Sequence, residues 1–97
     1  MNYEIESTVD YDEWFNNIKN RKSKMRVIAR LARVEQGNFG DTKQLTENLF
    51  ELRFTFDGGL RIYYTVLDSC VILLNVGNKS GQSKDINRAK EILNELE

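Results

Sequence analysis

The side chains best able to do chemistry in this chain are arginines, lysines and tyrosines, because the sequence contains no histidine and one cysteine. These counts exclude Ser-His-Asp and Cys-His nucleophile systems, and they exclude zinc sites built from Cys and His. Acid–base chemistry near neutral pH therefore falls to Lys, Tyr, Asp or Glu side chains whose pKa values are shifted. We accordingly expect no metal site and no other cofactor.

Arg53 and Arg61 occupy polar positions on two predicted neighbouring strands. Apolar and polar residues alternate through residues 49–56 and again through residues 60–66, which is typical of half-buried strands. Residues 57–59 read Asp-Gly-Gly, a turn signal, so the two strands are expected to form a hairpin. Both arginines then project from the same polar face, where each guanidinium can grip a phosphate through two hydrogen bonds.

The register of this hairpin decides which side chains meet. A three-residue turn keeps apolar residues opposite apolar residues, whereas a two-residue turn would pair apolar with polar positions. In the three-residue register Arg53 lies opposite Tyr63, and Arg61 is the diagonal neighbour on the same face. Two guanidiniums held this close need an anion between them, which favours a phosphate site. The alternative is a hydrated sheet face on which Glu51 pairs with Arg53.

Basic residues also cluster along the chain, although the net charge is only −1. Residues 1–16 carry five acids and no base, whereas residues 17–35 carry seven bases and one acid. Four of these bases share an arc of a predicted helix, away from its apolar stripe; they are Lys22, Arg26, Arg30 and Arg33. Such an arc can bind a phosphate backbone or an acidic protein segment, and a solvated helix face is the alternative.

Hydrophobic periodicity predicts seven elements in the order strand, helix, helix, strand, strand, strand, helix. The first strand is expected at residues 3–8. Asp10 is expected to cap a helix whose apolar face falls within residues 11–18. A break follows, and a second helix is expected to start near Ser23 and to reach Glu35, giving a helical hairpin.

The C-terminal half supplies the rest of the sheet and one more helix. Residues 37–48 are expected to form a loop, and residues 70–76 a strand covered on both faces because they are almost continuously apolar. Ser83 is expected to cap the last helix. The predicted fold class is therefore α+β, with a largely antiparallel sheet in a single domain spanning residues 1–97.

Size and composition exclude several other classes of protein. A chain of 97 residues has room for one core, and 40% apolar with 30% charged residues excludes a disordered chain. The longest apolar run, Val71 to Leu74, is far too short to span a membrane. The N-terminus does not resemble a signal peptide, and the single cysteine fits a reducing compartment, so we expect a cytoplasmic protein with no membrane contact.

Five segments in this order and spacing resemble one known superfamily of bacterial proteins. The segments are residues 37–43 (GNFGDTK), 50–54 (FELRF), 59–64 (GLRIYY), 72–80 (ILLNVGNKS) and 82–86 (QSKDI). Together they resemble toxins of the RelE/ParE superfamily of type II toxin–antitoxin systems, in the HigB-like branch of addiction module killer proteins, also described as phage-derived Gp49-like. The resemblance covers nearly the whole chain and implies a RelE-like fold.

The resemblance also implies a function. Toxins of the RelE and HigB kinds are mRNA interferases, endoribonucleases that cleave mRNA on the ribosome, inhibit translation and arrest growth until an antitoxin binds them. The implied partners are the ribosome, mRNA and a cognate helix-turn-helix antitoxin, with DNA contacted only through the antitoxin complex. The alternatives on the same fold are a ParE-like DNA gyrase poison and a binding protein without catalytic activity.

The family's functional positions map onto cationic residues of this chain. The implied catalytic residues, which need no metal, are Arg61, Arg53 and Lys79. From their positions beside this site we also expect contacts to RNA or phosphate from Lys43, Lys84, Gln82 and Tyr63, whose ring could stack on a base. The alternative for the two lysines is a surface position without a role. The basic arc defined above is the implied contact to the ribosome or the antitoxin. The general base stays open because the chain lacks histidine and has no tyrosine after residue 77. We expect replacement of Arg61 by alanine to cost little stability.

Overall fold

A five-stranded sheet forms the centre of the molecule in the computed structural model, which describes residues 2–96. The strands are β1 (Glu4–Ser7), β2 (Thr42–Thr46), β3 (Leu49–Arg53), β4 (Leu60–Leu67) and β5 (Cys70–Asn78). The helices are α1 (Val9–Asn16), α2 (Arg21–Glu35) and α3 (Gln82–Leu96), with a 3-10 turn, η1 (Lys79–Gly81), before α3. The strand order is β1-β5-β4-β3-β2. β1 runs parallel to β5 and the other neighbours are antiparallel, so the predicted α+β class and its largely antiparallel sheet are confirmed.

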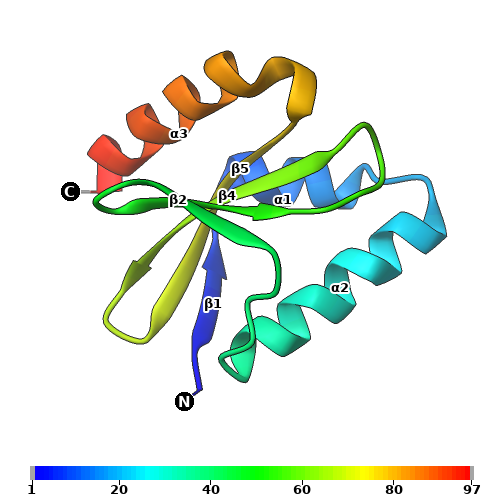
Figure 1. The fold of residues 1–97 in the computed structure, drawn as a ribbon, viewed down its shortest axis with the longest axis horizontal. Helices are drawn as coiled ribbons and strands as arrows, with labels where there is room; N and C mark the ends of the chain where they lie inside the picture. Colours follow the sequence, from blue (N-terminus) through cyan, green and yellow to red (C-terminus); the bar gives the residue numbers. More distant parts are fainter. Residues whose placement is uncertain (1, 97) are drawn as a thin grey trace.

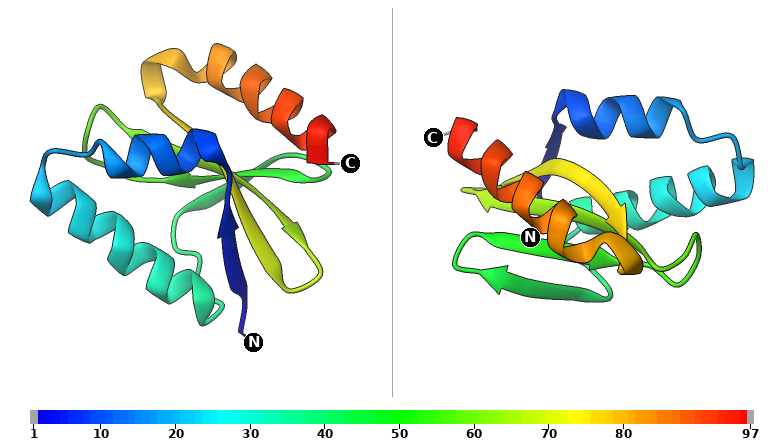
Figure 2. Two further views of the ribbon diagram at one scale, coloured as in Figure 1. Left: turned by 180° about the vertical axis from the view of Figure 1, so that it is seen from behind. Right: turned by 90° about the horizontal axis from the view of Figure 1, so that it is seen from above.

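The hairpin of α1 and α2 covers one face of the sheet, and α3 crosses the opposite face (Figures 1 and 2). The first face is apolar because alternate positions of the central strands, including Leu52, Ile62 and Leu73, point toward α1 and α2. Val27 and Val34 of α2 complete that core and are fully buried. No helix within residues 2–96 is long and apolar enough to cross a membrane.

The opposite face carries both apolar and polar side chains beneath α3. Near the C-terminal end of α3, Ala89 and Leu93 pack on Tyr63 and Leu74 of the sheet. Near its N-terminal end, the helix is fixed by a hydrogen bond of 3.0 Å from the Asn75 side-chain amide to the Asp85 carbonyl. Figure 2 shows α3 laid diagonally over the sheet, so its first turn stands over the end of β5. The polar side of the β3–β4 hairpin is therefore partly covered by this helix.

The helix starts differ from the predicted caps. Thr8 caps α1, because its hydroxyl accepts a hydrogen bond of 3.3 Å from the Tyr11 amide and donates to the Leu74 carbonyl of β5. Asp10, the expected cap, lies inside α1 and forms a two-point ion pair with Arg88 of α3. At the other end of the chain, α3 begins at Gln82, directly after η1, which Asn78 caps. Ser83 therefore lies inside α3, and the expectation that it caps this helix is also wrong.

The prediction that residues 37–48 form a loop is wrong, because β2 lies within them as an edge strand. Its sequence, TKQLT, shows no clear alternation of apolar and polar residues. Thr42 is fixed by tertiary contacts instead: its hydroxyl donates to the Glu51 carbonyl at 2.8 Å and lies 2.7 Å from the Tyr64 hydroxyl. Pairing with β3 therefore creates a strand that the local sequence does not specify.

The β3–β4 register differs from the predicted one by two residues. Arg53 lies opposite Arg61, and Glu51 lies opposite Tyr63. The connection is longer than expected, because β3 ends at Arg53 and residues 54–59 form the turn, with positive φ at its last three positions. Phe56 leaves the ladder to pack on Phe54. A shift of two keeps every side chain on its predicted face but changes its partner.

Candidate functional site

Polar side chains of the β3–β4 hairpin and Gln82 of α3 form a largely buried cluster, which we call the Glu51 cluster. It consists of Glu51, Arg53, Arg61, Tyr63 and Gln82. The Glu51 carboxylate is fully buried, and its Oε2 lies 3.5 Å from the Nε of Arg53 and 3.5 Å from the Nε of Arg61. Its Oε1 accepts a long hydrogen bond of 3.4 Å from the Gln82 side chain. Glu51 therefore supplies the anion that two facing arginines require.

Arg61 lies inside the protein, although the sequence analysis expected it to be replaceable without loss of stability. Its side chain is only 7% exposed. Its Nη1 donates to the carbonyls of Gly59, Leu60 and Phe54 at 3.1, 3.2 and 3.4 Å. These contacts join the Arg61 guanidinium to the turn of the hairpin through three carbonyls. Arg61 is thus a structural member of the cluster that faces away from solvent.

Arg53 differs from Arg61 in its access to solvent. Its side chain is 39% exposed, yet its Nε is buried beside Glu51. The exposed part of the side chain is therefore the outer portion of the guanidinium, which leaves hydrogen-bond donors available to an external anion. Among the cationic residues of this hairpin, Arg53 has its Nε held beside Glu51 while the outer part of its guanidinium reaches solvent.

Tyr63 is also buried, so it is not exposed for stacking on a nucleotide base as the sequence analysis expected. Burial, with a smaller contribution from the charges of Glu51 and Asp85, raises the pKa of Tyr63 to about 12. Its hydroxyl has no hydrogen-bond partner within residues 2–96. The Nε atoms of Arg53 and Arg61 likewise contact Glu51 at ion-pair distance only. The cluster is therefore held by charge attraction more than by aligned hydrogen bonds.

Three predicted lysines lie around the rim of the cluster. Lys79 and the Arg61 guanidinium flank Gly59 from two sides: a Cβ built on Gly59 would lie 3.0 Å from Lys79 Cβ and 3.5 Å from Arg61 Nη1. Lys43 is exposed on the edge strand β2, with its Cα paired to that of Glu51. Lys84 shares with Lys79 a surface hollow at the start of α3. Arg53, Arg61 and Lys79 thus lie at one end of the hairpin.

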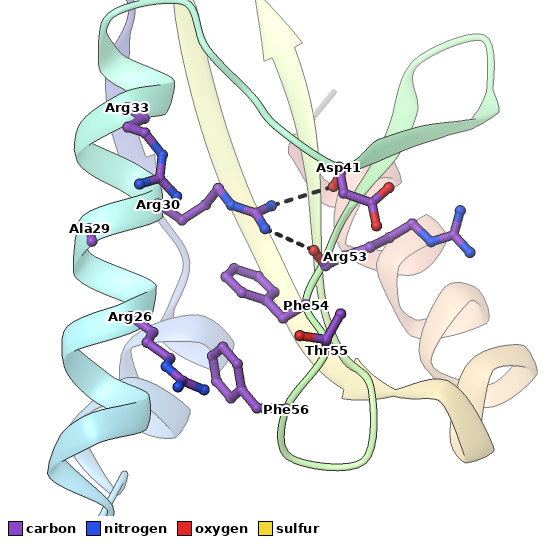
Figure 3. A pocket seen from close by; sticks show the side chains of 9 residues that line it. All are labelled: Arg26, Ala29, Arg30, Arg33, Asp41, Arg53, Phe54, Thr55 and Phe56. Carbon is purple, nitrogen blue, oxygen red and sulfur yellow. Dashed lines mark hydrogen bonds between the residues drawn. The ribbon is translucent and has the colours of Figure 1, made fainter.

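A second basic surface lies on the other side of the hairpin, between α2 and residues 53–56, as Figure 3 shows. It is a hollow of about 390 Å³, which we call the arginine pocket. Successive turns of α2 contribute three cationic side chains, Arg26, Arg30 and Arg33, and the facing residues Arg53 and Asp41 also line the hollow. Among residues 2–96, none of the three has a carboxylate within ion-pair distance. Lys22 does not line the pocket, so the predicted arc of four is divided.

Arg30 holds α2 to the sheet and is not a free member of this surface. Its guanidinium donates to the carbonyls of Arg53 and Asp41 at 3.0 and 3.4 Å, and it lies 4.4 Å from the centre of the Phe54 ring (Figure 3). Burial and the nearby charge of Arg33 lower the pKa of Arg30. Arg26 covers Phe56 more loosely, at 5.2 Å. Arg26 and Arg33 are therefore the exposed cations that α2 contributes to the pocket.

Glu51 is the cluster member that the sequence analysis did not count as functional. Its alternation with Arg53 placed it on the polar face, and the analysis named it only as a surface partner of that arginine. The signal that was missing is the cover provided by α3, because a hydrated face and a buried ion cluster share the same residue pattern. Within residues 2–96 no three His, Cys, Asp or Glu side chains gather as a metal site would require.

The order and arrangement of the helices and strands define a RelE-like α+β fold. The chain aligns with a double-substituted E. coli toxin RelE in the free state at a TM-score of 0.73, with 15% identity over 94% of this chain and 97% of the other. It aligns with the intact E. coli RelBE toxin–antitoxin complex at 0.60, with 15% identity over 78% and 95%. For the RelBE2 toxin–antitoxin complex of Mycobacterium tuberculosis the TM-score is 0.66, with 15% identity over 81% and 100%.

Sequence comparison identifies the family. The profile of the family described as phage-derived protein Gp49-like (DUF891) matches residues 13–95. An uncharacterized protein of Haemophilus influenzae is 40% identical over 97 residues, which are 99% of this chain and 98% of that protein. The chain therefore belongs to the phage-derived Gp49-like family, and the resemblance to that family and to RelE is confirmed.

Proposed function

We propose that this protein is the toxin of a type II toxin–antitoxin system and acts as a ribosome-dependent mRNA endoribonuclease in the cytoplasm. The observation that carries the proposal is the arrangement at the end of the hairpin, where Arg53 and Lys79 lie beside the buried Glu51–Arg61 pair. The RelE-like fold of the chain supports it. The proposed RNA contacts around this centre are Lys43 and Lys84 at the rim. Tyr63, which is fully buried, and Gln82, which donates to Glu51, support the site from beneath.

The proposed reaction needs the RNA, cationic side chains and solvent water. The 2′-hydroxyl gives its proton to water as its oxygen attacks the adjacent phosphorus, the bond from phosphorus to the 5′-oxygen breaks, and the products are a 2′,3′-cyclic phosphate and a 5′-hydroxyl. Arg53 and Lys79 stabilise the charge that grows on the phosphate oxygens, and Lys79 donates the proton to the leaving oxygen. Arg61 contributes from inside by holding the turn. We assign no residue as the general base.

The first test is to induce the protein in cells and map the 5′ ends of cleaved transcripts against the reading frame. The parent protein should arrest growth and produce in-frame cleavage sites, whereas Arg53→Ala and Lys79→Ala should each reduce cleavage at least tenfold. Lys90→Ala, which removes an exposed charge from α3, is the matched control and should remain toxic. Growth arrest without transcript cleavage would refute the nuclease and would favour the gyrase poison.

A second test concerns metal ions. Because the proposed chemistry uses cations of the protein, cleavage should persist in excess EDTA once the magnesium requirement of the ribosome is met separately. A requirement for an added divalent metal, seen with the parent protein on ribosome-bound mRNA, would overturn the proposed mechanism.

The arginine pocket and Lys22 are proposed to contact the ribosome or a helix-turn-helix antitoxin, with DNA reached only through the antitoxin. Two of the similar structures are toxin–antitoxin complexes. Arg26→Glu with Arg33→Glu should weaken ribosome co-sedimentation and its dependence on salt, and Arg30 is left intact because it supports the fold. Lys19→Glu with Lys90→Glu changes the net charge equally and should have little effect. Equal loss in both pairs would show that net charge alone matters.

A further inference from the structure

The Glu51 carboxylate has a buried position that the proposed reaction leaves without a role. It lies at the centre of β3, fully buried, and contacts two guanidiniums at equal Oε2–Nε distances of 3.5 Å. No other carboxylate within residues 2–96 lies within ion-pair distance of Arg53 or Arg61. Burying a carboxylate is costly unless it is paired, so its retention here requires these two arginines.

The contact with Glu51 fixes one end of the Arg53 guanidinium and leaves the other end open. The Nε of Arg53 is buried on the carboxylate side, whereas the side chain as a whole is 39% exposed. The main chain of Arg53 is held as well, because its amide donates to the Asp41 carbonyl at 2.9 Å and its carbonyl accepts from Arg30 at 3.0 Å. With the backbone and Nε fixed, the direction of the exposed tip is determined.

We propose that Glu51 is a positioning residue, which orients the Arg53 guanidinium so that its outer donors meet a phosphodiester of RNA. The proposal deepens the proposed function and rests on it. Glu51 does not itself touch RNA, because its side chain is fully buried and lies beneath Gln82 and the arginines. Glu51 affects RNA binding through Arg53. Its ion pair with Arg61 also holds the turn of the hairpin that follows Arg53.

The test measures whether the effect of Glu51 depends on Arg53. The variants are Glu51→Gln, Arg53→Gln and the two together, and the measurements are fluorescence anisotropy with a short fluorescein-labelled single-stranded RNA and thermal unfolding. Glu51→Gln should weaken RNA binding on the order of tenfold, the loss expected for one charge-assisted contact. It should weaken binding no further in the Arg53→Gln protein, whereas its effect on thermal stability should appear in both backgrounds.

Glu47→Gln is the matched control, because it removes an exposed carboxylate from the β2–β3 turn and changes the net charge equally. It should leave RNA binding within twofold of the parent protein. Equal loss of RNA binding by Glu51→Gln with and without Arg53 would show a general structural role and overturn the proposal. If Glu51→Gln does not fold, Glu51→Gln with Arg61→Gln removes both charges of the buried pair and replaces it in the same comparison.

A measurement without RNA separates this proposal from the proposed function. The Nε–Hε resonance of Arg53 in an NMR spectrum should be sharp in the parent protein, and in Glu51→Gln it should shift toward the free-arginine position and lose intensity. Absence of RNA cleavage together with this change would refute the nuclease while supporting Glu51 as the residue that orients Arg53. An unchanged resonance would overturn the positioning role whatever the activity.

Discussion

Replacing Arg61 tests whether this arginine, which the sequence analysis named as catalytic, has a structural role instead. Arg61→Ala removes three hydrogen bonds to turn carbonyls and the buried partner of Glu51. Removing one member of a buried ion pair costs about 3–5 kcal/mol when the remaining charge is left without compensation. Arg53 still lies 3.5 Å from Glu51, so we expect a loss near the lower limit, about 3 kcal/mol. Solvent screening should reduce this cost only slightly, because the Arg61 side chain is only 7% exposed.

The expected loss is large for a domain of this size. The free energy of unfolding of small domains is about 5–15 kcal/mol, so the substitution removes a substantial part of it. At roughly 4–8 °C per kcal/mol for a chain of this length, the midpoint of thermal unfolding should fall by roughly 12–24 °C. Loss of toxicity in Arg61→Ala would then follow from unfolding and would not identify Arg61 as a catalytic group.

Urea unfolding followed by circular dichroism measures the loss directly. Lys79→Ala removes a neighbouring exposed cation and should change the free energy of unfolding by about 0.5 kcal/mol or less. Glu51→Gln with Arg61→Gln should cost clearly less than the sum of the two single substitutions, because the pair is removed as a unit. If Arg61→Ala lowers stability by under about 1 kcal/mol, the buried-pair reasoning is refuted.

Three further predictions follow from the contacts. Arg30→Gln should lower the free energy of unfolding in urea by about 1–3 kcal/mol, because Arg30 binds two carbonyls and the face of an aromatic ring. Arg26→Gln should change it little, and equal losses in the two variants would contradict this distinction. Burial raises the pKa of Tyr63 to about 12 in the folded protein, so the native state keeps a proton that the unfolded state loses near pH ~10. Stability should therefore fall as the pH rises between these two values, and a flat profile of unfolding midpoint against pH would contradict this prediction. Burial and the neighbouring Glu6 carboxylate raise the pKa of Cys70 to about 11. Glu6→Gln should therefore speed alkylation of Cys70 by iodoacetamide at mildly alkaline pH, and an unchanged rate profile would contradict the effect of Glu6 on this thiol.

Local sequence signals were reliable where an element is specified by its own residues. The alternation from Phe50 to Arg53 and the helical spacing of Val27 and Val34 predicted the correct faces of β3 and α2, because side-chain periodicity follows directly from backbone geometry. The same reasoning missed β2, whose pairing with β3 and contacts to Tyr64 come from distant parts of the chain. Strand formation depends on neighbours that a local pattern does not contain.

The sequence by itself determined the α+β class, the polar face shared by Arg53 and Arg61, and the lack of histidine chemistry. Only the tertiary structure decided which of these groups reach solvent. The shift of two residues at the turn kept side chains on their faces but set Arg53 opposite Arg61, and α3 then covered Glu51 and Arg61 while leaving the tip of Arg53 exposed. The physical reason is that periodicity specifies the direction of a side chain, whereas its burial depends on which element packs over it.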